Sequence, residues 1–584
     1  MMNSISPAAI LLAGAVLLLL LPGRIRPAAF LVFPALAFWW LLQANPGDSL
    51  SMSFLNYDLV LVRVDRLSLV FGYVFVLITF IGGIYAFHVK DKGEQSAALL
   101  YGGSSLGVVF SGDLLTLVVF WEIMAVSSVY LVWARRTPAS RGAGMRYLMV
   151  HLFGGSVLIA GVLMHIAQTG SIMFDLLDSS ISSYLILLAF CLNAAVPPLH
   201  AWLSDAYPEG TVTGTVFLSA FTTKTAVYVL ARGFAGWELL IWAGSIMAVY
   251  GVVYAALQND ARRLLAYHIV SQVGYMVAGV GLGTFAAVDG ATAHAFTHIL
   301  YKALLFMGVG AVLYATGRSK LSELGGLARV MPWVLVLYMI GAFSISGVPL
   351  FSGFVSKSMI IDAAGATGSG IAMVLLTLAS VGTFLSVGLK LPYFAWFGSK
   401  SSGETKPVPP GMYIGMGITA LICIVIGVYP AVLYSILPYP VDFHPYTSGH
   451  VIETLQLLVF TAAGFWLLLK WLHPKDLSYL DIDWLYRRPA RLAYRLFVVP
   501  VNKAFAEADV VSARVVRLLT RIGANPVEYL RLLATFSNRP GSSSSKAGTQ
   551  DYDPDLSRVP VEPMILIVLL FFVVLIAWGL FKLS

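Results

Sequence analysis

Hydrophobic residues occur in this chain in long runs, and short polar or charged segments separate the runs. A helix needs about twenty such residues to cross about 30 Å of hydrocarbon. The pattern therefore predicts an all-α, polytopic membrane protein with about sixteen crossings. The predicted spans lie near residues 8–22, 28–43, 67–88, 97–111, 114–133, 147–168, 183–203, 210–232, 238–258, 264–283, 289–316, 331–365, 373–397, 412–436, 452–471 and 562–582.

Two of the predicted spans, the seventh and the twelfth, are interrupted in the middle. The first interruption reads Asn193-Ala-Ala-Val-Pro-Pro-Leu-His200, and the second reads Ser344-Ile-Ser-Gly-Val-Pro-Leu-Phe-Ser-Gly353. Proline removes a main-chain donor, and the freed groups are tolerated at membrane depth only where they line a cavity or are buried in protein. Paired interruptions are typical of inverted-repeat transporters. By position, spans four to eight and nine to thirteen are the two predicted repeats.

The pattern changes after the fifteenth span, where residues 479–535 combine many arginines with spaced apolar residues. Such a basic amphipathic segment is suited to lying along a membrane surface or a row of neighbouring helices. Pro489, Pro500 and Pro526 are expected to divide it, and a polar stretch, 537–560, leads to the final span. The alternative is a soluble basic tail at the inner face.

Composition agrees with the pattern of runs. The chain is 58% hydrophobic and 11% charged, with a mean hydropathy of +0.83, whereas soluble domains carry about 25% charged residues. The net charge of +8 comes from basic residues at the ends of apolar runs, so we expect no nucleic-acid partner. Cys191 and Cys423 lie in apolar segments and form no metal or disulfide pattern. We expect no cofactor and no metal, and any redox chemistry would belong to a partner.

The distribution of basic residues predicts the orientation. Arg24 and Arg26 follow the first apolar run and no basic residue precedes it, so we expect a retained first span and not a cleaved signal. With the N-terminus outside, most basic loop residues fall on the cytoplasmic side, and Arg262 and Arg263 are assigned to this topological role. We expect a prokaryotic inner-membrane protein that has both termini outside and its basic amphipathic segment at the cytoplasmic face.

Three ionisable residues lie in one apolar span, at His294, His298 and Lys302. Their four-residue spacing places them on one stripe of a helix. Ionisable side chains at membrane depth are costly and usually face a bundle interior or a water-filled cavity. The stripe therefore predicts a proton relay. The alternative is a polar stripe that joins helices by hydrogen bonds.

Other spans carry further candidates for a proton pathway. Glu122 and Lys224 each lie within a span. If they approach one another, each favours the charged form of the other and the pair acts as a switch. The alternative is a purely structural ion pair. Further candidates are His268, Lys357 and Lys390. The alternative for Lys390 is a lysine whose side chain extends to the membrane interface. Asp205 and Glu209 would feed protons from the inner mouth, unless they are ordinary loop carboxylates.

Several motifs in order, over roughly residues 95–400, give the chain a family resemblance. It resembles the antiporter-like membrane subunits of respiratory complex I, membrane-bound hydrogenases and Mrp-type multisubunit sodium/proton antiporters. The run Ala266-Tyr-His-Ile-Val-Ser-Gln272 favours the Mrp D-like and hydrogenase branch. The motifs are Phe120-Trp-Glu122, Val196-Pro-Pro-Leu-His-Ala-Trp-Leu-Ser-Asp205, Thr223-Lys-Thr-Ala-Val-Tyr228, Asn259-Asp-Ala-Arg-Arg-Leu-Leu-Ala-Tyr-His-Ile-Val-Ser-Gln-Val-Gly-Tyr275, His294 to Phe306, and Gly347-Val-Pro-Leu-Phe-Ser-Gly-Phe-Val-Ser-Lys357.

The resemblance implies two inverted five-helix repeats, each with a half-channel, joined by a polar axis. It implies that Glu122 is the glutamate of the fifth span, Lys224 the lysine of the eighth, and Lys357 the terminal lysine in the broken twelfth. The histidine and lysine stripe matches the central relay. The C-terminal segment resembles the lateral helix and anchor of the distal complex I subunit. The predicted divisions are 1–94 (helices 1–3), 95–263 and 264–400 (the two repeats), 401–475 (helices 14–15), 476–560 (lateral segment and linker) and 561–584 (anchor).

One position departs from the family pattern. The family usually places a lysine, as partner of the glutamate, where this chain has Asn193. Asparagine does not titrate, so two interpretations stay open. Either Lys224 is the partner of Glu122, or the N-terminal half conducts passively or passes electrostatic coupling to its neighbours.

The function predicted from these features is proton translocation, with or without sodium exchange, by one subunit of a larger membrane complex. Its partners would be other membrane subunits, the lipid bilayer and an energy source such as a redox arm. A structural or electrostatic-coupling scaffold subunit is one alternative. The membrane component of an energy-coupled bicarbonate uptake system is another.

Overall fold

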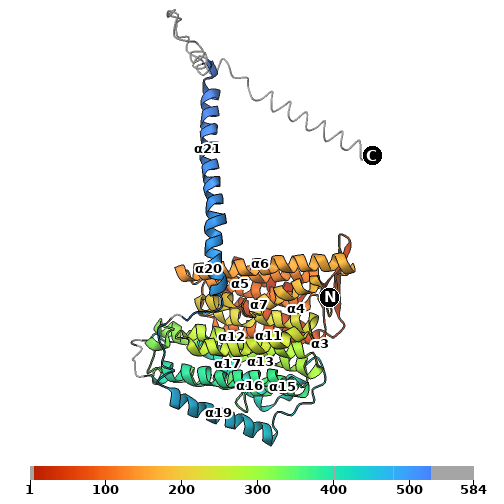
Figure 1. The fold of residues 1–584 in the computed structure, drawn as a ribbon, viewed down its shortest axis with the longest axis vertical. Coiled ribbons are helices and arrows are strands. Elements are labelled where there is room, and N and C mark those ends of the chain that lie inside the picture. The colour runs from red at the N-terminus through yellow and green to blue at the C-terminus, as the bar shows by residue number, and fades with distance from the viewer. Residues whose placement is uncertain (1–4, 399–402, 404, 478, 528–529, 531–584) are drawn as a thin grey trace, which may run out of the picture. The chain divides into compact units, whose positions relative to one another are not determined.

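The computed structural model describes residues 5–398, 403, 405–477, 479–527 and 530. The chain divides into two compact units, one from Met1 to Asp483 and one that begins at Trp484. The first unit is a helical bundle, which confirms the predicted all-α fold (Figure 1). Within the described residues, eleven helical segments are long and apolar enough to cross a membrane, and α1, α7 and α14 are apolar but shorter. The sixteenth predicted span, 562–582, lies outside the described residues, and the count of sixteen stays a prediction.

Many of the helices begin where a short polar side chain accepts a hydrogen bond from the first turn. Caps of this kind include Asp65, Asp91, Asp113, Thr137, Ser180, Asp260, Thr284 and Thr447. The helices up to the middle of the first unit are α1 (Pro7–Leu20), α2 (Arg26–Gln43), α3 (Arg66–Tyr85), α4 (Lys92–Phe110), α5 (Leu114–Trp133), α6 (Pro138–Thr169), α7 (Ile181–Asn193), α8 (Ala201–Ala206), η2 (Tyr207–Glu209), α9 (Gly214–Ala220) and α10 (Thr222–Gly233).

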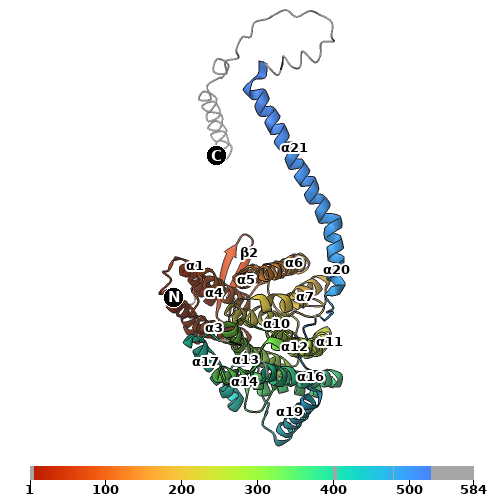
Figure 2. The ribbon, with the colours of Figure 1, turned by 90° about the vertical axis from the view of Figure 1, so that its left-hand side faces the viewer.

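The second half of the unit continues the bundle. Its helices are α11 (Glu238–Leu257), α12 (Ala261–Leu282), α13 (Phe285–Thr316), η3 (Leu321–Glu323), α14 (Pro332–Ser346), α15 (Ser352–Ala366), α16 (Gly370–Thr383), the π-helical segments η4 (Phe384–Lys390) and η5 (Tyr393–Phe397), α17 (Pro410–Val428), α18 (Ala431–Tyr434) and α19 (Ser448–Leu468). Helices α6 and α19 lie at opposite edges of the bundle, and α12 and α13 lie between them (Figures 1 and 2).

Helix α13 is the centre of the first unit. It packs against α3, α9, α10, α12, α14, α15 and α17. Every residue from 287 to 312 is buried. The stripe of ionisable residues predicted on this span therefore lies in the protein interior and not on a lipid-facing surface.

Both predicted interruptions are breaks between two helices. The chain leaves helical geometry between α7 and α8, where Ala195 has φ of 60°. It does so again between α14 and α15, where Gly347 and Leu350 have φ of 75° and 73°. The second break is tight, because a Cβ added at Gly353 would lie 1.8 Å from the main-chain oxygen of Ser344. The assignment of the two halves as inverted repeats stays a prediction.

A two-stranded hairpin joins α2 to α3, which the all-helical prediction did not include. Strand β1 (Ser49–Phe54) pairs antiparallel with β2 (Tyr57–Arg63). The N–H of Val60 donates to the Asp113 carboxylate over 2.7 Å, and the N–H of Gly112 donates to the carbonyl of Val60 over 2.9 Å. The hairpin is therefore tied to the turn between α4 and α5.

The described part of the second unit is one helical stretch. It consists of α20 (Trp484–Ala493), the π-helical segment η6 (Tyr494–Val498) and α21 (Val499–Ala524). The prediction that Pro489 divides the segment is wrong, whereas Pro500 stands in the first turn of α21, where the π-helical segment η6 gives way to an α-helix. Each proline removes only one main-chain donor, and the helix continues through or next to it, with a π-helical stretch just before Pro500. The helix ends at Ala524, before Pro526.

Replacing Gly353 with alanine is expected to lower the free energy of unfolding by more than about 2 kcal/mol, because the new methyl group collides with a main-chain oxygen that has no room to move. Thermal unfolding of the purified protein in detergent measures the effect. Gly417→Ala is the control, since a Cβ there meets nothing within 4 Å, and alanine suits a helix interior better than glycine does. Equal stability of the two variants would contradict the prediction.

Candidate functional site

The three side chains of the predicted stripe on α13, His294, His298 and Lys302, are all completely buried. His294 and His298 lie one turn apart with ring centroids 6.2 Å from one another. Lys302 follows after one more turn. The structure therefore places the predicted stripe together, at the centre of the bundle.

His294 is the member of the stripe with the most hydrogen bonds. Its Nδ1 lies 3.1 Å from the Ser356 hydroxyl, which is 2.8 Å from the Thr297 hydroxyl. Its Nε2 lies 3.3 Å from the Tyr301 hydroxyl, which donates to Gln272 over 3.4 Å. A chain of hydroxyl groups thus connects α13 with α12 and α15 through the imidazole.

His298 and Lys302 differ from His294. Both ring nitrogens of His298 and the Nζ atom of Lys302 are buried without a hydrogen-bond partner in the described part of the chain. Buried polar groups without partners are rare and costly in folded proteins. Helix α10, which carries Lys224, packs against α13.

Lys357 lies in the second half of the broken twelfth span. Its Nζ atom donates to the carbonyl of Ile345 over 2.7 Å and to the Ser380 hydroxyl over 3.4 Å, and it lies 5.2 Å from the centre of the Tyr275 ring. In a continuous helix that carbonyl would accept from residue 349, but residue 349 is proline and has no N–H. The lysine therefore satisfies an acceptor that the break creates.

A cleft of about 810 Å³ reaches the side chain of Lys357. It lies between α15, α16, α19 and the segment before α19. Within the described residues, no three histidine, cysteine, aspartate or glutamate side chains are placed to hold a metal ion. The other ionisable and hydroxyl side chains that line the cleft are Ser346, Ser358, Asp362, Thr377, Ser380, Asp442, His444, Thr447, His450, Glu453 and Thr454.

Lys224 and Glu122 do not form the pair that the sequence allowed. The Nζ atom of Lys224 donates to the carbonyl of Ser219 over 2.5 Å, across the kink at Phe221 that separates α9 from α10. Oε1 of Glu122 is buried without a hydrogen-bond partner in the described residues, and it lies against Gly155 of α6. The interpretation that Lys224 is the direct partner of Glu122 is therefore not supported by the geometry.

Asn193 has a different neighbour, which the sequence analysis missed. Its Oδ1 atom lies 3.0 Å from Nδ1 of His151, a residue of α6 that is 2% exposed. A signal for His151 was present, because it is an ionisable residue inside a predicted span, as Glu122 and Lys224 are. It was overlooked because it belongs to none of the family motifs.

His268 of α12 and Lys390 of η4 are each held by contacts with a neighbouring element. Nε2 of His268 is 2.7 Å from the Ser386 hydroxyl, one helical turn before Lys390 in η4. Nζ of Lys390 donates to the carbonyls of Ala256 and Gln258 at the end of α11, over 2.6 and 3.1 Å. Lys390 is 3% exposed, so it does not extend to the surface as the alternative interpretation required.

The two predicted mouth carboxylates are held in ion pairs. Asp205 lies 3.1 Å from Arg146 and 3.3 Å from Arg263, and Glu209 lies 3.0 Å from Arg135. They are not the free loop carboxylates of the alternative interpretation. Their role as proton donors to the axis stays a prediction.

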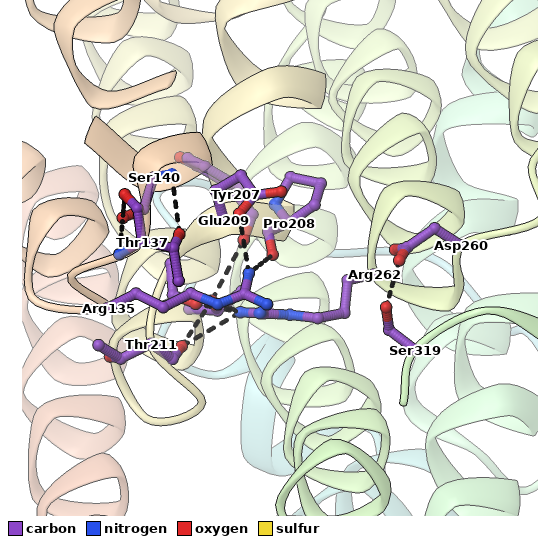
Figure 3. A network of polar contacts seen from close by, with 12 residues as sticks. Arg135, Thr137, Ser140, Tyr207, Pro208, Glu209, Thr211, Asp260, Arg262 and Ser319 are labelled. Carbon is purple, nitrogen blue, oxygen red and sulfur yellow. Dashed lines mark hydrogen bonds and ion pairs between the residues drawn. The ribbon is translucent and has the colours of Figure 1, made fainter. Parts of the chain in front are cut away.

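Arg262 is buried in the same region, so its assignment to topology alone is wrong. It is 2% exposed, and its Nη2 atom donates to the carbonyls of Gly210 and Thr211 over 2.9 and 3.1 Å and to the Thr215 hydroxyl. Figure 3 shows its guanidinium group beside that of Arg135, against the turn between η2 and α9. Arg262 therefore fixes this turn from α12.

A second buried contact links the segment after α19 to the broken seventh span. The carboxylate of Asp481 lies 3.1 Å from Nε2 of His200 and accepts hydrogen bonds from the hydroxyls of Tyr250 and Tyr267. Burial alone would raise the pKa of Asp481, but these three donors outweigh it and lower the pKa to about 2. Sequence reasoning missed this contact because 281 positions separate Asp481 from His200.

Residues 111–386 match the family described as NADH:quinone oxidoreductase/Mrp antiporter, TM. Two relatives are Na(+)/H(+) antiporter subunits of Alkalihalophilus pseudofirmus. The first is 32% identical over 435 residues, which cover 64% of this chain and 53% of the relative. The second is 31% identical over 321 residues, which cover 51% of this chain and 65% of the relative. The matched region thus spans between about half and two thirds of these relatives.

A solved structure has the same fold. A chain of the membrane-bound sulfane sulfur reductase, an archaeal respiratory membrane complex, superposes with a TM-score of 0.72 and 23% identity. The match covers 87% of this chain and 99% of that chain. This agreement establishes the polytopic fold for most of the chain.

Replacing Asp481 with asparagine is expected to lower the free energy of unfolding by about 1–2 kcal/mol near neutral pH, since the charge-assisted bond to His200 is lost. A carboxylate whose pKa is lowered by folding stabilises the protein above its ordinary value of 3.8, and this contribution disappears as the pH falls toward about 2. Hydrogen exchange of residues 470–483 between about pH 3 and pH 8 checks both statements.

Asp476→Asn is the matched control for this measurement. Asp476 also forms an ion pair, at 2.9 Å from Lys320, but its side chain is 71% exposed. Exposed pairs contribute little to stability because solvent screens them, so little change is expected. Equal effects of the two substitutions, or a difference that grows as the pH falls, would contradict the assignment of Asp481.

Proposed function

We propose that this chain, which belongs to the superfamily of antiporter-like membrane subunits, moves protons along its axis of glutamate, lysine and histidine side chains as one subunit of a multisubunit inner-membrane complex. One observation carries the proposal. A run of completely or almost completely buried ionisable side chains extends from Lys224 on α10, through His298, Lys302 and His294 on α13, to Lys357 on α15.

The electrostatics of this run favour transfer over static pairing. In the described residues, the ion pairs include none of these five side chains. A positive charge on one of them makes a positive charge on its neighbour more costly. The arrival of a proton at one site therefore promotes its departure from the next, which is the behaviour that a relay requires.

The hydrogen bonds of His294 allow a proton to pass through this ring without rearrangement of the helices. A neutral imidazole donates from one nitrogen and accepts at the other, so His294 can receive a proton from one side and release it on the other. The lysines at the helix interruptions bond main-chain carbonyls, and both the neutral amine and the ammonium can donate such a bond. Lys224 and Lys357 thus keep their positions in either protonation state.

We place the two openings of the pathway by combining the cleft with the predicted orientation. The cleft at Lys357 opens beside the segments 367–369 and 429–447, which the alternation of spans puts outside. Lys390, whose side chain bonds the carbonyls at the end of α11, would then lie toward the cytoplasm. Exchange of sodium for protons is part of this proposal, since both relatives described above are named as Na(+)/H(+) antiporter subunits.

A scaffold or coupling role in the complex is the second candidate. Two observations favour it: Asn193 stands where the family usually has a lysine, and the second unit presents one amphipathic helical stretch from Trp484 to Ala524. A protein of this kind would assemble its neighbours and transmit charge movements without conducting ions itself.

Gradient-driven pH change in inverted vesicles that contain the whole complex distinguishes the two candidates. Lys302→Ala is expected to lower proton movement at least tenfold, because it removes a titratable site from the centre of the relay, and Glu122→Gln is expected to do the same. Lys92→Ala, at an exposed position, is the control and is expected to be silent.

Assembly of the complex is measured in parallel for each variant. Loss of proton movement in an assembled complex supports the relay. Wild-type proton movement in both variants would contradict it and leave the scaffold function.

A further inference from the structure

His151 is a buried histidine that the pathway described above does not use. Its ring is 2% exposed, and Nδ1 lies 3.0 Å from Oδ1 of Asn193, the last residue of α7 before the break. An amide oxygen only accepts, so this bond places the proton of a neutral ring on Nδ1. The second nitrogen, Nε2, is then the acceptor, and it is buried without a partner in the described residues.

We propose that His151, oriented by Asn193, is the proton-carrying base of the N-terminal half of the axis and replaces the lysine that the family usually carries at position 193. The inference rests on the proposed function and names the residue that makes this half competent. Asn193 is then a positioning residue, and it does not mark a disabled half-channel.

Aromatic rings hold the imidazole in place. The Tyr147 ring centroid lies 4.1 Å from that of His151, and the Trp202 ring lies 4.5 Å away. Trp202 itself donates to the carbonyl of Leu192 over 2.9 Å, at the break of the seventh span. Aromatic faces also stabilise a positive charge beside them, so this pocket accommodates the protonated ring.

Glu122 approaches the same face of α6. A Cβ added at Gly155 would lie 1.7 Å from Oε1 of Glu122, so the carboxylate lies directly against this glycine. His151 precedes Gly155 by four residues, which puts the two on one face about 6 Å apart along the axis. Glu122 and His151 thus share one face of α6, each with a polar atom that lacks a partner in the described residues.

Hydroxyl groups lead from Tyr147, whose ring packs on that of His151, toward the start of α10. The hydroxyl of Tyr147 lies 3.5 Å from that of Thr222, which is 2.5 Å from the Tyr101 hydroxyl. Thr222 begins α10, and Lys224 follows two residues later. A proton taken up by the Glu122 carboxylate would pass to Nε2 of His151, which leaves a carboxylate and an imidazolium. The imidazolium would then release the proton toward the start of α10, the helix that carries Lys224, and return to its neutral form.

The C-terminal half contains the same arrangement. His294 lies on α13, which is the third span of the second predicted repeat. His151 lies on α6, which is the third span of the first predicted repeat. Nδ1 of His294 is hydrogen-bonded to Ser356, which follows the break in the twelfth span. Asn193, the partner of His151, precedes the break in the seventh span. In both halves, a histidine of the long third helix is oriented by a side chain at the break of the next span.

The other ionisable groups near His151 are accounted for. The elements packed on α6 are α5, α7, α8 and η2. Apart from Glu122, they carry Tyr130 of α5, Tyr184 and Cys191 of α7, Asp205 in its ion pairs with Arg146 and Arg263, and Tyr207 and Glu209 of η2, the latter paired with Arg135. On α6 itself lie Arg141, Arg146, Tyr147 and His165. A change in the pH profile on mutation of position 151 or 193 therefore has His151 and Glu122 as its nearest sources.

The test uses the whole complex in inverted vesicles, with assembly measured for each variant. His151→Gln is expected to lower proton movement at least tenfold, whereas His165→Gln, on the same helix but partly exposed, is expected to be silent. The double variant His151→Gln/Asn193→Lys is expected to recover transport, because it returns a titratable base to the family position. Asn193→Asp is expected to shift the pH profile of transport upward by about one unit, because a carboxylate stabilises the imidazolium.

The outcomes separate this inference from the proposed function. If Lys302→Ala abolishes transport while His151→Gln keeps the wild-type rate and pH profile, the inference is overturned and the proposed function stands. If Lys302→Ala is silent as well, the proposed function itself fails. If His151→Gln does not assemble, Asn193→Asp decides, and an unchanged pH profile in that variant overturns the role of His151.

Discussion

A main-chain carbonyl that loses its helical donor inside a membrane must find another donor, because no water of the bulk phase can replace it. In this chain lysines supply the missing bonds. Lys224 donates at the kink of the eighth span, Lys357 at the break of the twelfth, and Lys390 at the end of α11. The interruptions that loosen the helices are thus the features that fix the lysines in place. Fold and candidate chemistry depend on the same contacts, so neither can be altered alone.

Lys302 is the exception, and its position explains why. It lies in the unbroken part of α13, where the carbonyls already have helical donors, and its Nζ atom finds no hydrogen-bond partner in the described residues, only the Phe306 ring at 5.8 Å. The axis therefore contains two kinds of site, lysines anchored at interruptions and a lysine without an anchor between them. Because the anchored amines keep their bonds in both protonation states, the free amine is the one whose surroundings change most when it gains a proton.

The sequence was sufficient for features that depend on local pattern. The breaks at Pro197 and Pro349, the stripe from His294 and the long apolar runs all follow from spacing and residue type. It was insufficient for contacts that depend on how two helices are rotated against one another. The bond between His151 and Asn193 crosses from α6 to α7, and no pattern within either helix indicates it. The contact between Asp481 and His200 could not be predicted either, because 281 positions separate the two residues along the chain.

Arg262 shows a further limit, because a basic residue at the end of a span has the same sequence pattern whether it faces the cytoplasm or holds a turn from within. The substitution at position 193 shows the same limit for chemistry. When position 193 is compared only with the family motif, its asparagine indicates that a titratable base is missing there. In the structure, its amide orients His151, one turn from the glycine that contacts Glu122. A relay requires a titratable group at a suitable distance from its neighbours in the pathway, and not at a particular position in the sequence. Helices packed side by side provide more than one sequence position from which a side chain can reach the same place in the pathway.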